Sequence, residues 1–295
     1  MNLTNKSLLE ITTKIENRLK KYNKITFTVE NPDYNLNSRG YKTWVNLAEL
    51  HYCKMLTPKI VEHQLIEITF KKLNIENSFH SAPINDPKEK YGVESKFFTI
   101  NKNEEPTFLH AYRKALESVK IKDRKSTLNL GINRGDEFEL IEQLIGKKSF
   151  NSINFIGIDH SKTALEYAKE RFPKENLKFY QHDINRIKEL NLPLFDLIIS
   201  IGTLQSPSIN YQPFLMSLVQ EHLTPDGAFI LGFPNSRWID NELIYGAKAP
   251  NYPYSEMSLL YNDVIFAKKY LQQKRFRVTI TGREYIFLTA TRIKI

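Results

Sequence analysis

Apolar and polar residues follow two distinct patterns along the second two-thirds of the chain. Short, nearly continuous apolar runs predict buried strands, and stretches in which apolar residues recur every three or four positions predict helices. The expected strands are residues 128–130, 154–159, 177–183, 195–202, 228–233, 275–281 and 285–293. The expected helices are residues 105–119, 136–145, 162–171, 214–223 and 264–273. Strands that alternate with helices are typical of an α/β protein with a parallel sheet.

The last two expected strands depart from this alternation, because only Gly282-Arg-Glu separates them. A parallel connection needs a dozen or more residues, so these two strands must be antiparallel. The pattern therefore predicts an α/β fold with a doubly wound, mostly parallel seven-stranded sheet and one antiparallel strand near the edge. We expect this domain to span residues 105–295.

The first 104 residues do not fit the sheet pattern. Residues 3–22, 41–55 and 58–73 carry apolar positions near helical spacing, and the β-branched run 25–29 predicts one short strand. Residues 79–98 are polar and contain proline, which predicts a surface loop. We expect a mainly helical N-terminal extension over residues 1–104. Such an extension can act as a lid or as a homodimer contact, and the sequence does not separate these roles.

The segment from strand 128–130 to Asp159 carries the main chemical signal. A glycine turn, Gly131-Ile-Asn-Arg-Gly135, follows the strand, and Asp159 ends the next strand roughly 24 residues later. A turn of this kind lets a ligand approach the backbone, and an acid ~20 residues further on can bind ribose hydroxyls. The segment therefore favours a nucleoside-containing cofactor. Phe138 stands where a dinucleotide fingerprint has its third glycine, so NAD or FAD is a poor match.

The order of these elements resembles the class I S-adenosylmethionine (SAM) methyltransferases over about residues 105–295. Their first motif, acid-x-G-x-G-x-G, aligns with Asn129, Gly131, Asn133 and Gly135. The fourth motif resembles Phe195-Asp-Leu-Ile, and Leu223-Thr-Pro-Asp-Gly before an apolar strand also recurs in the family. The main alternative is another doubly wound nucleotide-binding fold.

The resemblance implies that SAM is the cofactor and assigns roles to further residues. Asp159 would bind the ribose, Asp183 the adenine amino group, and Ile184 would lend its backbone or apolar face. The residues implied at the cofactor are Asn129, Gly131, Asn133, Gly135, Asp159, His160, Asp183, Ile184, Ile201 and Gly202. Asn129 replaces the family's acid and Asn133 replaces a glycine. Asn tolerates the left-handed backbone that glycine adopts there, whereas an amide at 129 is only a neutral partner.

A long insertion, residues 239–262, follows the strand 228–233 and lies at the ligand-binding edge of such a sheet. Loops of this length in compact domains are commonly functional. Its aromatic and basic side chains can stack on a planar acceptor or bind an anionic one. The candidates are Arg237, Trp238, Tyr245, Lys248 and Tyr252. The alternative is a surface loop that packs only on itself.

Composition narrows the remaining choices. A single cysteine excludes an internal disulfide, no metal-type Cys/His spacing occurs, and no apolar stretch approaches a membrane span, so we expect a cytoplasmic protein without metal. The net charge of +9 and pI near 9.3 are compatible with a nucleic-acid partner, but the basic residues are dispersed along the chain. The amino-methylating motif N/D-P-P-Y of many DNA methyltransferases is replaced by Gly202-Thr-Leu-Gln-Ser-Pro.

The leading hypothesis is a SAM-dependent methyltransferase that acts on a small-molecule acceptor. An RNA methyltransferase is the first alternative, because of the positive charge. A non-catalytic module that binds SAM or a nucleoside is the second, because of Asn129 and Asn133. No catalytic base is assigned.

Overall fold

The computed structural model describes residues 1–34, 39–77, 86–245 and 257–293. Contacts within the chain divide it into two compact units. Unit 1 comprises Met1–Ser81 and Trp238–Ile244, and unit 2 comprises Ala82–Arg237 and Tyr245–Ile295. The first division falls after residue 81, so the boundary expected at residue 104 was too late in the chain.

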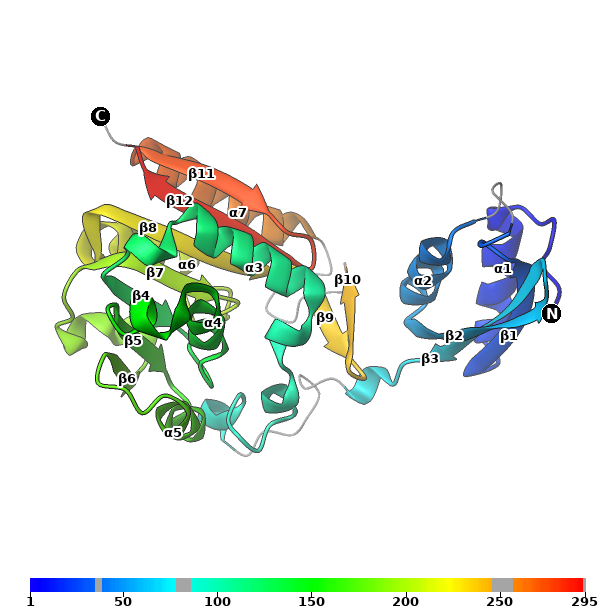
Figure 1. The fold of residues 1–295 in the computed structure, drawn as a ribbon, viewed down its shortest axis with the longest axis horizontal. Coiled ribbons are helices and arrows are strands. Elements are labelled where there is room, and N and C mark those ends of the chain that lie inside the picture. Colours follow the sequence, from blue (N-terminus) through cyan, green and yellow to red (C-terminus); the bar gives the residue numbers. More distant parts are fainter. Residues whose placement is uncertain (35–38, 78–85, 246–256, 294–295) are drawn as a thin grey trace. The chain divides into compact units, whose positions relative to one another are not determined.

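Unit 2 is built on a seven-stranded sheet with the order β11-β12-β8-β7-β4-β5-β6 (Figure 1). The strands from β8 to β6 pair in parallel, and β12 runs antiparallel to both β8 and β11. The strands are β4 (Ser126–Leu130), β5 (Asn154–Asp159), β6 (Leu177–Gln181), β7 (Phe195–Ile201), β8 (Leu223–Pro234), β11 (Phe276–Thr281) and β12 (Tyr285–Arg292). This topology confirms the doubly wound, mostly parallel sheet expected from the sequence.

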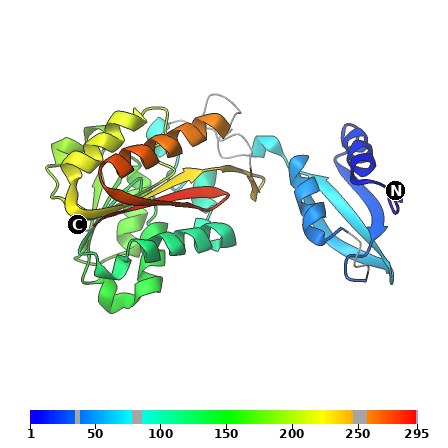
Figure 2. The same ribbon diagram turned by 90° about the horizontal axis from the view of Figure 1, so that it is seen from above.

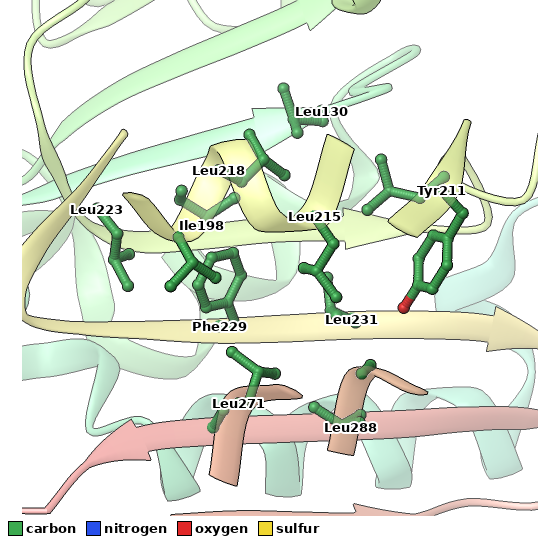
Figure 3. Close-up of a cluster of buried hydrophobic side chains, with 14 of the residues drawn as sticks. Leu130, Ile198, Tyr211, Leu215, Leu218, Leu223, Phe229, Leu231, Leu271 and Leu288 are labelled. Carbon is green, nitrogen blue, oxygen red and sulfur yellow. The ribbon is translucent and has the colours of Figure 1, made fainter. Parts of the chain in front are cut away.

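Helices cover both faces of this sheet, which is why the central strand β7 is buried along almost its whole length. On one face α6 (Tyr211–Ser217) and α7 (Met257–Gln273) pack on an apolar cluster that includes Phe229 and Leu231 (Figure 3). The other face carries α3 (Pro106–Ser118), α4 (Asp136–Phe150) and α5 (Lys162–Arg171). Figure 2 shows the orange α7 and the green α3 on opposite sides of the sheet. In the described ranges, no helix is long and apolar enough to cross a bilayer.

Several elements differ in detail from their expected limits. Helix α4 is interrupted at Gly146, where φ is 79°, one residue after the end that the sequence predicts. The helix expected at 214–223 begins earlier, at Tyr211, and continues as a π-helical turn, η7 (Leu218–His222). The insertion at 239–262 was expected to be a loop, but it contains the end of β9 (Ser236–Ile239) and β10 (Glu242–Tyr245).

Unit 1 contains a three-stranded antiparallel sheet with the order β1-β3-β2. Its elements are α1 (Leu8–Leu19), β1 (Lys24–Glu30), α2 (Tyr41–Leu50), β2 (Cys53–Glu62) and β3 (Leu65–Lys72). Both helices pack on one face of this sheet, because the buried residues of α1 and α2 share one cluster with Phe27 and Phe70. Ser7 is the N-cap of α1 and forms a capping box with Glu10.

The prediction of a helix at residues 58–73 is wrong, because β2 and β3 occupy this stretch. The prediction of a mainly helical N-terminal part is therefore wrong as well. Ile66, Ile68 and Phe70 are buried while the residues between them are not, which is the two-residue period of a strand. Pro58 did not disrupt the sheet, because β2 lies at its edge and the register shifts between Leu56 and Lys59.

The aromatic packing under α4 gives a stability test. Phe155 is 1% exposed, and its ring centroid lies 4.5 Å from that of Phe150 and 4.9 Å from that of Phe138. We expect Phe155→Ala to lower the free energy of unfolding of unit 2 by about 3–5 kcal/mol, because it leaves a cavity. The control is Phe214→Ala, which removes a partly buried ring from α6. Urea titration followed by circular dichroism measures both, and equal losses would contradict this account.

Candidate cofactor site

Three residues of the glycine turn after β4 have positive φ: Gly131 (78°), Asn133 (47°) and Gly135 (87°). The turn is held against β5, because the backbone N–H groups of Gly131 and Ile132 both donate to the carbonyl of Ile158. A Cβ on Gly131 would lie 1.9 Å from Oγ1 of Thr203, and one on Gly135 would lie 2.6 Å from the ring of Phe172. Both glycines are therefore required by space as well as by backbone conformation.

Asp159 ends β5 beside this turn and is 6% exposed. Its carboxylate accepts the backbone N–H of Asn133 at 2.9 Å and that of Ser161 at 3.0 Å. A carboxylate offers about four acceptor positions, so about two remain for a ligand. Asp159 thus shapes both loops and keeps acceptor capacity for a pair of hydroxyl groups.

The other residues implied at the cofactor lie along the same edge, where the parallel strands β4 to β7 end. Asp183 follows β6 and accepts the N–H of Asn185 at 2.9 Å, which begins a 3₁₀ turn at the buried Ile184. Ile201 ends β7, and Gly202 follows it with φ 76°. The exposed ring of His160 lies next to Asp159, with Nδ1 3.8 Å from the carboxylate.

Asn129 occupies the position at which the resembling family has an acid. Its side chain is 1% exposed, and its Nδ2 has no hydrogen-bond partner among the described residues. It lies opposite Ile199, so both residues face the layer of α3 and α4. A buried, unpaired donor is costly in a folded protein, so this Nδ2 is a candidate to bind a ligand.

Residues 86–104, here called the strap, run along this edge and belong to unit 2. Glu89 of the strap accepts bonds from Oγ of Ser161 (2.8 Å), N of Lys162 (2.8 Å) and Oγ1 of Thr163 (2.5 Å) at the start of α5. Burial raises the pKa of Glu89, but these donated bonds outweigh it and hold the pKa below its usual value. Glu89 therefore fastens the strap as a carboxylate.

Asn133 forms the second attachment of the strap. Its Nδ2 donates to the carbonyl of Tyr91 at 2.7 Å, while its backbone N–H donates to Asp159. The ring of Tyr91 lies 6.5 Å from that of His160, and burial together with the charge of Asp159 raises the pKa of the Tyr91 phenol. Asn133 thus keeps the positive φ expected of a glycine at this position, and its side chain adds a hydrogen bond to the strap.

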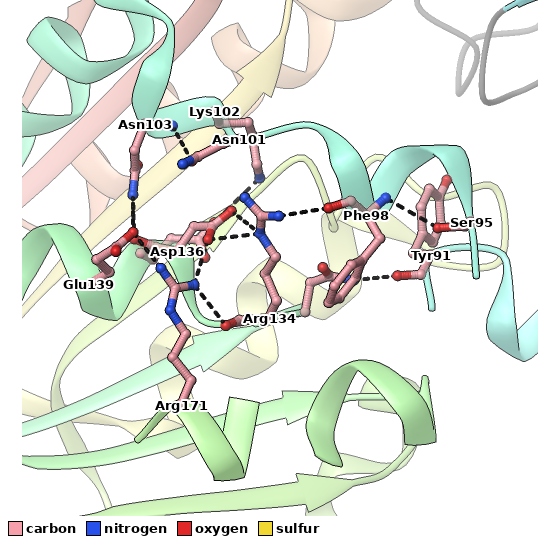
Figure 4. A network of polar contacts seen from close by, with 12 residues as sticks. Tyr91, Ser95, Phe98, Asn101, Lys102, Asn103, Arg134, Asp136, Glu139 and Arg171 are labelled. Carbon is pink, nitrogen blue, oxygen red and sulfur yellow. Dashed lines mark hydrogen bonds and ion pairs between the residues drawn. The ribbon is translucent and has the colours of Figure 1, made fainter. Parts of the chain in front are cut away.

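A charged network forms the third attachment (Figure 4). Arg134 donates to the carbonyl of Phe98 at 2.6 Å and to both carboxylate oxygens of Asp136 at 2.9 Å. Arg171 donates to the same carboxylate at 2.8 Å, and Asn103 donates to the carbonyl of Asp136. The network connects four segments: the strap, the glycine turn, the start of α4 and the end of α5.

A buried ion pair lies next to this network. Nζ of Lys102 is 3.4 Å from Glu137, and both side chains are largely buried. Burial lowers the pKa of Lys102, but the interactions with Glu137, Tyr285 and Asp136 together outweigh burial, so that pKa is raised and Lys102 stays protonated. The buried Tyr112 hydroxyl nearby has no hydrogen-bond partner among the described residues.

The structure describes three of the five residues expected at the acceptor, and it does not bring them together at one site. Arg237 lies in β9 within unit 2, and its Nε is buried without a hydrogen-bond partner among the described residues. Tyr245 also belongs to unit 2, where Arg283 stacks 4.8 Å from its ring centroid. Trp238 belongs to unit 1. Lys248 and Tyr252 lie outside the described residues.

Sequence reasoning missed Glu89, Tyr91 and Thr203. The strap residues stand in a polar stretch with no periodicity, so nothing local marks them. Thr203 follows Gly202 directly, and the need for space at Gly131 becomes visible only when the two loops meet.

The carboxylate of Glu89 gives a pH-dependent test. Because its folded pKa is lowered, its contribution is present above the usual value of 4.5 and is lost as the pH falls through the folded pKa. At pH 7 we expect Glu89→Gln to reduce hydrogen-exchange protection of the strap amides by about tenfold, since a charge-assisted bond is lost. Glu94→Gln, at an exposed position of the strap, is the control. Equal protection in both variants would contradict the attachment.

Comparison with solved structures finds similar chains among methyltransferases. The methyltransferase domain of bacterial CtHen1 is 17% identical, with 61% of this chain and 96% of that chain covered and a TM-score of 0.44. A TehB-like SAM-dependent methyltransferase from Corynebacterium glutamicum is 15% identical, with 62% and 87% covered and a TM-score of 0.41. An O-methyltransferase from Bacillus cereus in complex with SAH is 10% identical, with 61% and 80% covered and a TM-score of 0.44. No curated protein matches.

A family model described as a methyltransferase domain matches residues 121–276, which is more than half of the chain. The matched stretch contains the glycine turn, Asp159 and all five parallel strands from β6 to β8. The chain belongs to this family and is a SAM-dependent methyltransferase with the class I fold.

Proposed function

We propose that SAM binds along the carboxyl edge of the unit 2 sheet and that its methyl group passes to a small-molecule acceptor. The observation that carries the proposal is the carboxylate of Asp159, which holds the glycine turn in place and keeps acceptor capacity. In this proposal Asp159 binds the ribose hydroxyls, and Asp183 and Ile184 contact the adenine. His160, Ile201 and Gly202 border the same ligand.

The residue at 129 changes how the methionine end of SAM would be held. An acid there attracts the ammonium group, whereas the unpaired Nδ2 of Asn129 is a donor and suits the carboxylate. Gly131 and Gly135 let the turn pack closely on Thr203 and Phe172, and Asn133 keeps the positive φ of the turn, so the backbone holds the shape that the ligand would meet. The residues present therefore fit the cofactor, with an amide in the place of the acid.

The chemistry asks mainly for positioning. SAM supplies an activated methyl group, so the protein has to orient the acceptor and exclude water. For the acceptor we propose Arg237 and Tyr245, with Trp238, Lys248 and Tyr252 as further candidates. The buried Nε of Arg237, which lacks a partner among the described residues, supports an acceptor that carries an oxygen or an anionic group.

RNA is the second candidate acceptor. The observation in its favour is that lysines which are dispersed along the sequence come together at one end of the unit 1 sheet. The N-terminal unit would then present the acceptor, in place of the lid or homodimer role.

Calorimetry tests the cofactor site. We expect Asp159→Asn to weaken binding of SAM and of adenosine by about tenfold or more, because bonds from hydroxyls to a charged acceptor are lost. Asp123→Asn, which changes a carboxylate in the turn η5 (Ile121–Asp123) after α3, is the control. Unchanged affinity of the Asp159 variant, in a protein that still melts at the same temperature, would refute the assignment.

Transfer of a labelled methyl group from SAM tests the acceptor class. The purified protein is incubated with a cell extract that is separated into small molecules, RNA and protein. Label in small molecules supports the first candidate, and label in RNA supports the second. Binding of SAM without transfer to any fraction would instead favour a non-catalytic module.

A further inference from the structure

Three lysines form a row across the unit 1 sheet. Lys24 of β1 lies opposite Lys71 of β3, and Lys71 lies opposite Lys54 of β2. Residues that lie directly opposite share one face of a sheet. The neighbouring residues Ile25 and Phe70 point into the core under the helices, so the lysine row occupies the other face.

Other lysines lie close to this row. Lys20 and Lys21 follow the end of α1 immediately before β1, and Lys72 ends β3, where its backbone N–H donates to Asn23 at 2.8 Å. The six residues are here called the basic end: Lys20, Lys21, Lys24, Lys54, Lys71 and Lys72. Three separate chain segments contribute to it, which is why it is invisible in the sequence.

Acidic residues compensate this charge only in part. Glu242 lies 3.5 Å from Lys54, and Asp240 accepts bonds from Asn77 and Asn74 beside it. With Glu49 at the end of α2 and Glu76 in the turn η1 (Ile75–Asn77), whose N–H donates to Asn74, four acids stand near six lysines. In the remainder of unit 1, acidic and basic residues are equal in number. The positive charge of the unit is therefore concentrated at the basic end.

Two features of the basic end cost stability, although the second one also ends α2 and lets the carbonyl of Tyr52 accept the N–H of Leu73. Like charges directly opposite in a sheet are destabilising. Tyr52, which precedes β2, has φ of 50°, a conformation that bulky residues rarely adopt, and 40% of it is exposed. Tyr22, between Lys21 and Lys24, is 49% exposed, and Arg18 lies 5.6 Å from its ring centroid on one face. Strain and repulsion of this kind concentrate at binding sites.

We propose that the basic end binds single-stranded RNA. The lysines would contact phosphates, and the exposed rings of Tyr22 and Tyr52 would stack on bases, the combination used by proteins that bind single strands. Stacking requires unpaired bases, which favours single strands over duplexes. The inference deepens the second candidate function, RNA methylation, and depends on it for its biological meaning.

The experiment measures fluorescence anisotropy of a labelled ten-nucleotide oligouridine with the full chain and without SAM. The test variant combines Lys24→Ala, Lys54→Ala and Lys71→Ala. The control combines Lys14→Ala, Lys42→Ala and Lys59→Ala, which removes the same charge from exposed positions elsewhere in unit 1. We expect the test variant to bind at least tenfold more weakly and its log–log salt slope to shrink by about 2, since each phosphate contact contributes about 0.7. Because no SAM is present, this result is independent of the cofactor site.

A second pair of variants separates stacking from charge. We expect Tyr52→Ala to weaken binding about tenfold and Tyr52→Phe to restore it, because a phenyl ring stacks equally well. Tyr41→Ala, at another exposed tyrosine of the unit, should have little effect. A melting curve of each variant confirms that it is folded.

Several outcomes would overturn the proposal. Equal weakening by the control triple would show that only net charge matters. Tighter binding to duplex RNA or to single-stranded DNA of the same length would exclude the assigned occupant. Binding to phosphatidylserine vesicles with no binding to oligouridine would assign the basic end to a membrane surface, beside the exposed Leu50.

Discussion

The carboxylate of Asp159 is the interaction on which the functional half of unit 2 depends. Its two oxygens accept backbone N–H groups from different loops, one in the glycine turn and one before α5. Each loop would otherwise carry an unsatisfied donor near the edge of the sheet. The same side chain is the ribose ligand in our proposal, so loop geometry and cofactor affinity cannot be changed independently at this position.

The strap extends this dependence to the segment before α3. Glu89 attaches to the start of α5, Tyr91 attaches to Asn133, and Phe98 attaches to Arg134. All three partners lie on loops that Asp159 or the glycine turn positions. Asn133 is the clearest case in which an apparent loss from the family motif has a structural explanation, because its amide makes a bond that glycine lacks. Asn129 is different, since its Nδ2 finds no partner among the described residues.

Much of unit 2 could be predicted from sequence because its signals are local. Each strand is a short apolar run, each helix has its own periodicity, and the glycine turn and Asp159 lie within one β-α-β segment. The prediction of a helix at residues 58–73 fails because apolar residues in a short stretch can fit both periods. Ile66, Ile68 and Phe70 follow the two-residue period of a strand. The strap and the basic end depend on contacts between distant segments. Lys24 and Lys71 are neighbours only through strand register, and Glu89 meets Ser161 only through the fold.

The hairpin of β9 and β10 gives unit 1 an unusual dependence on the order of synthesis. Asp240 and Glu242, which bond Asn74, Asn77 and Lys54, are encoded more than 160 residues after those partners. At 5–20 residues per second, a ribosome needs roughly 8–40 s to add these acids. An N-terminal sheet that forms within that interval lacks Asp240 and Glu242, and its lysine row is less neutralised than in the finished protein. Until Asp240 and Glu242 are added, the N-terminal unit has a net charge that is more positive by two than in the finished protein.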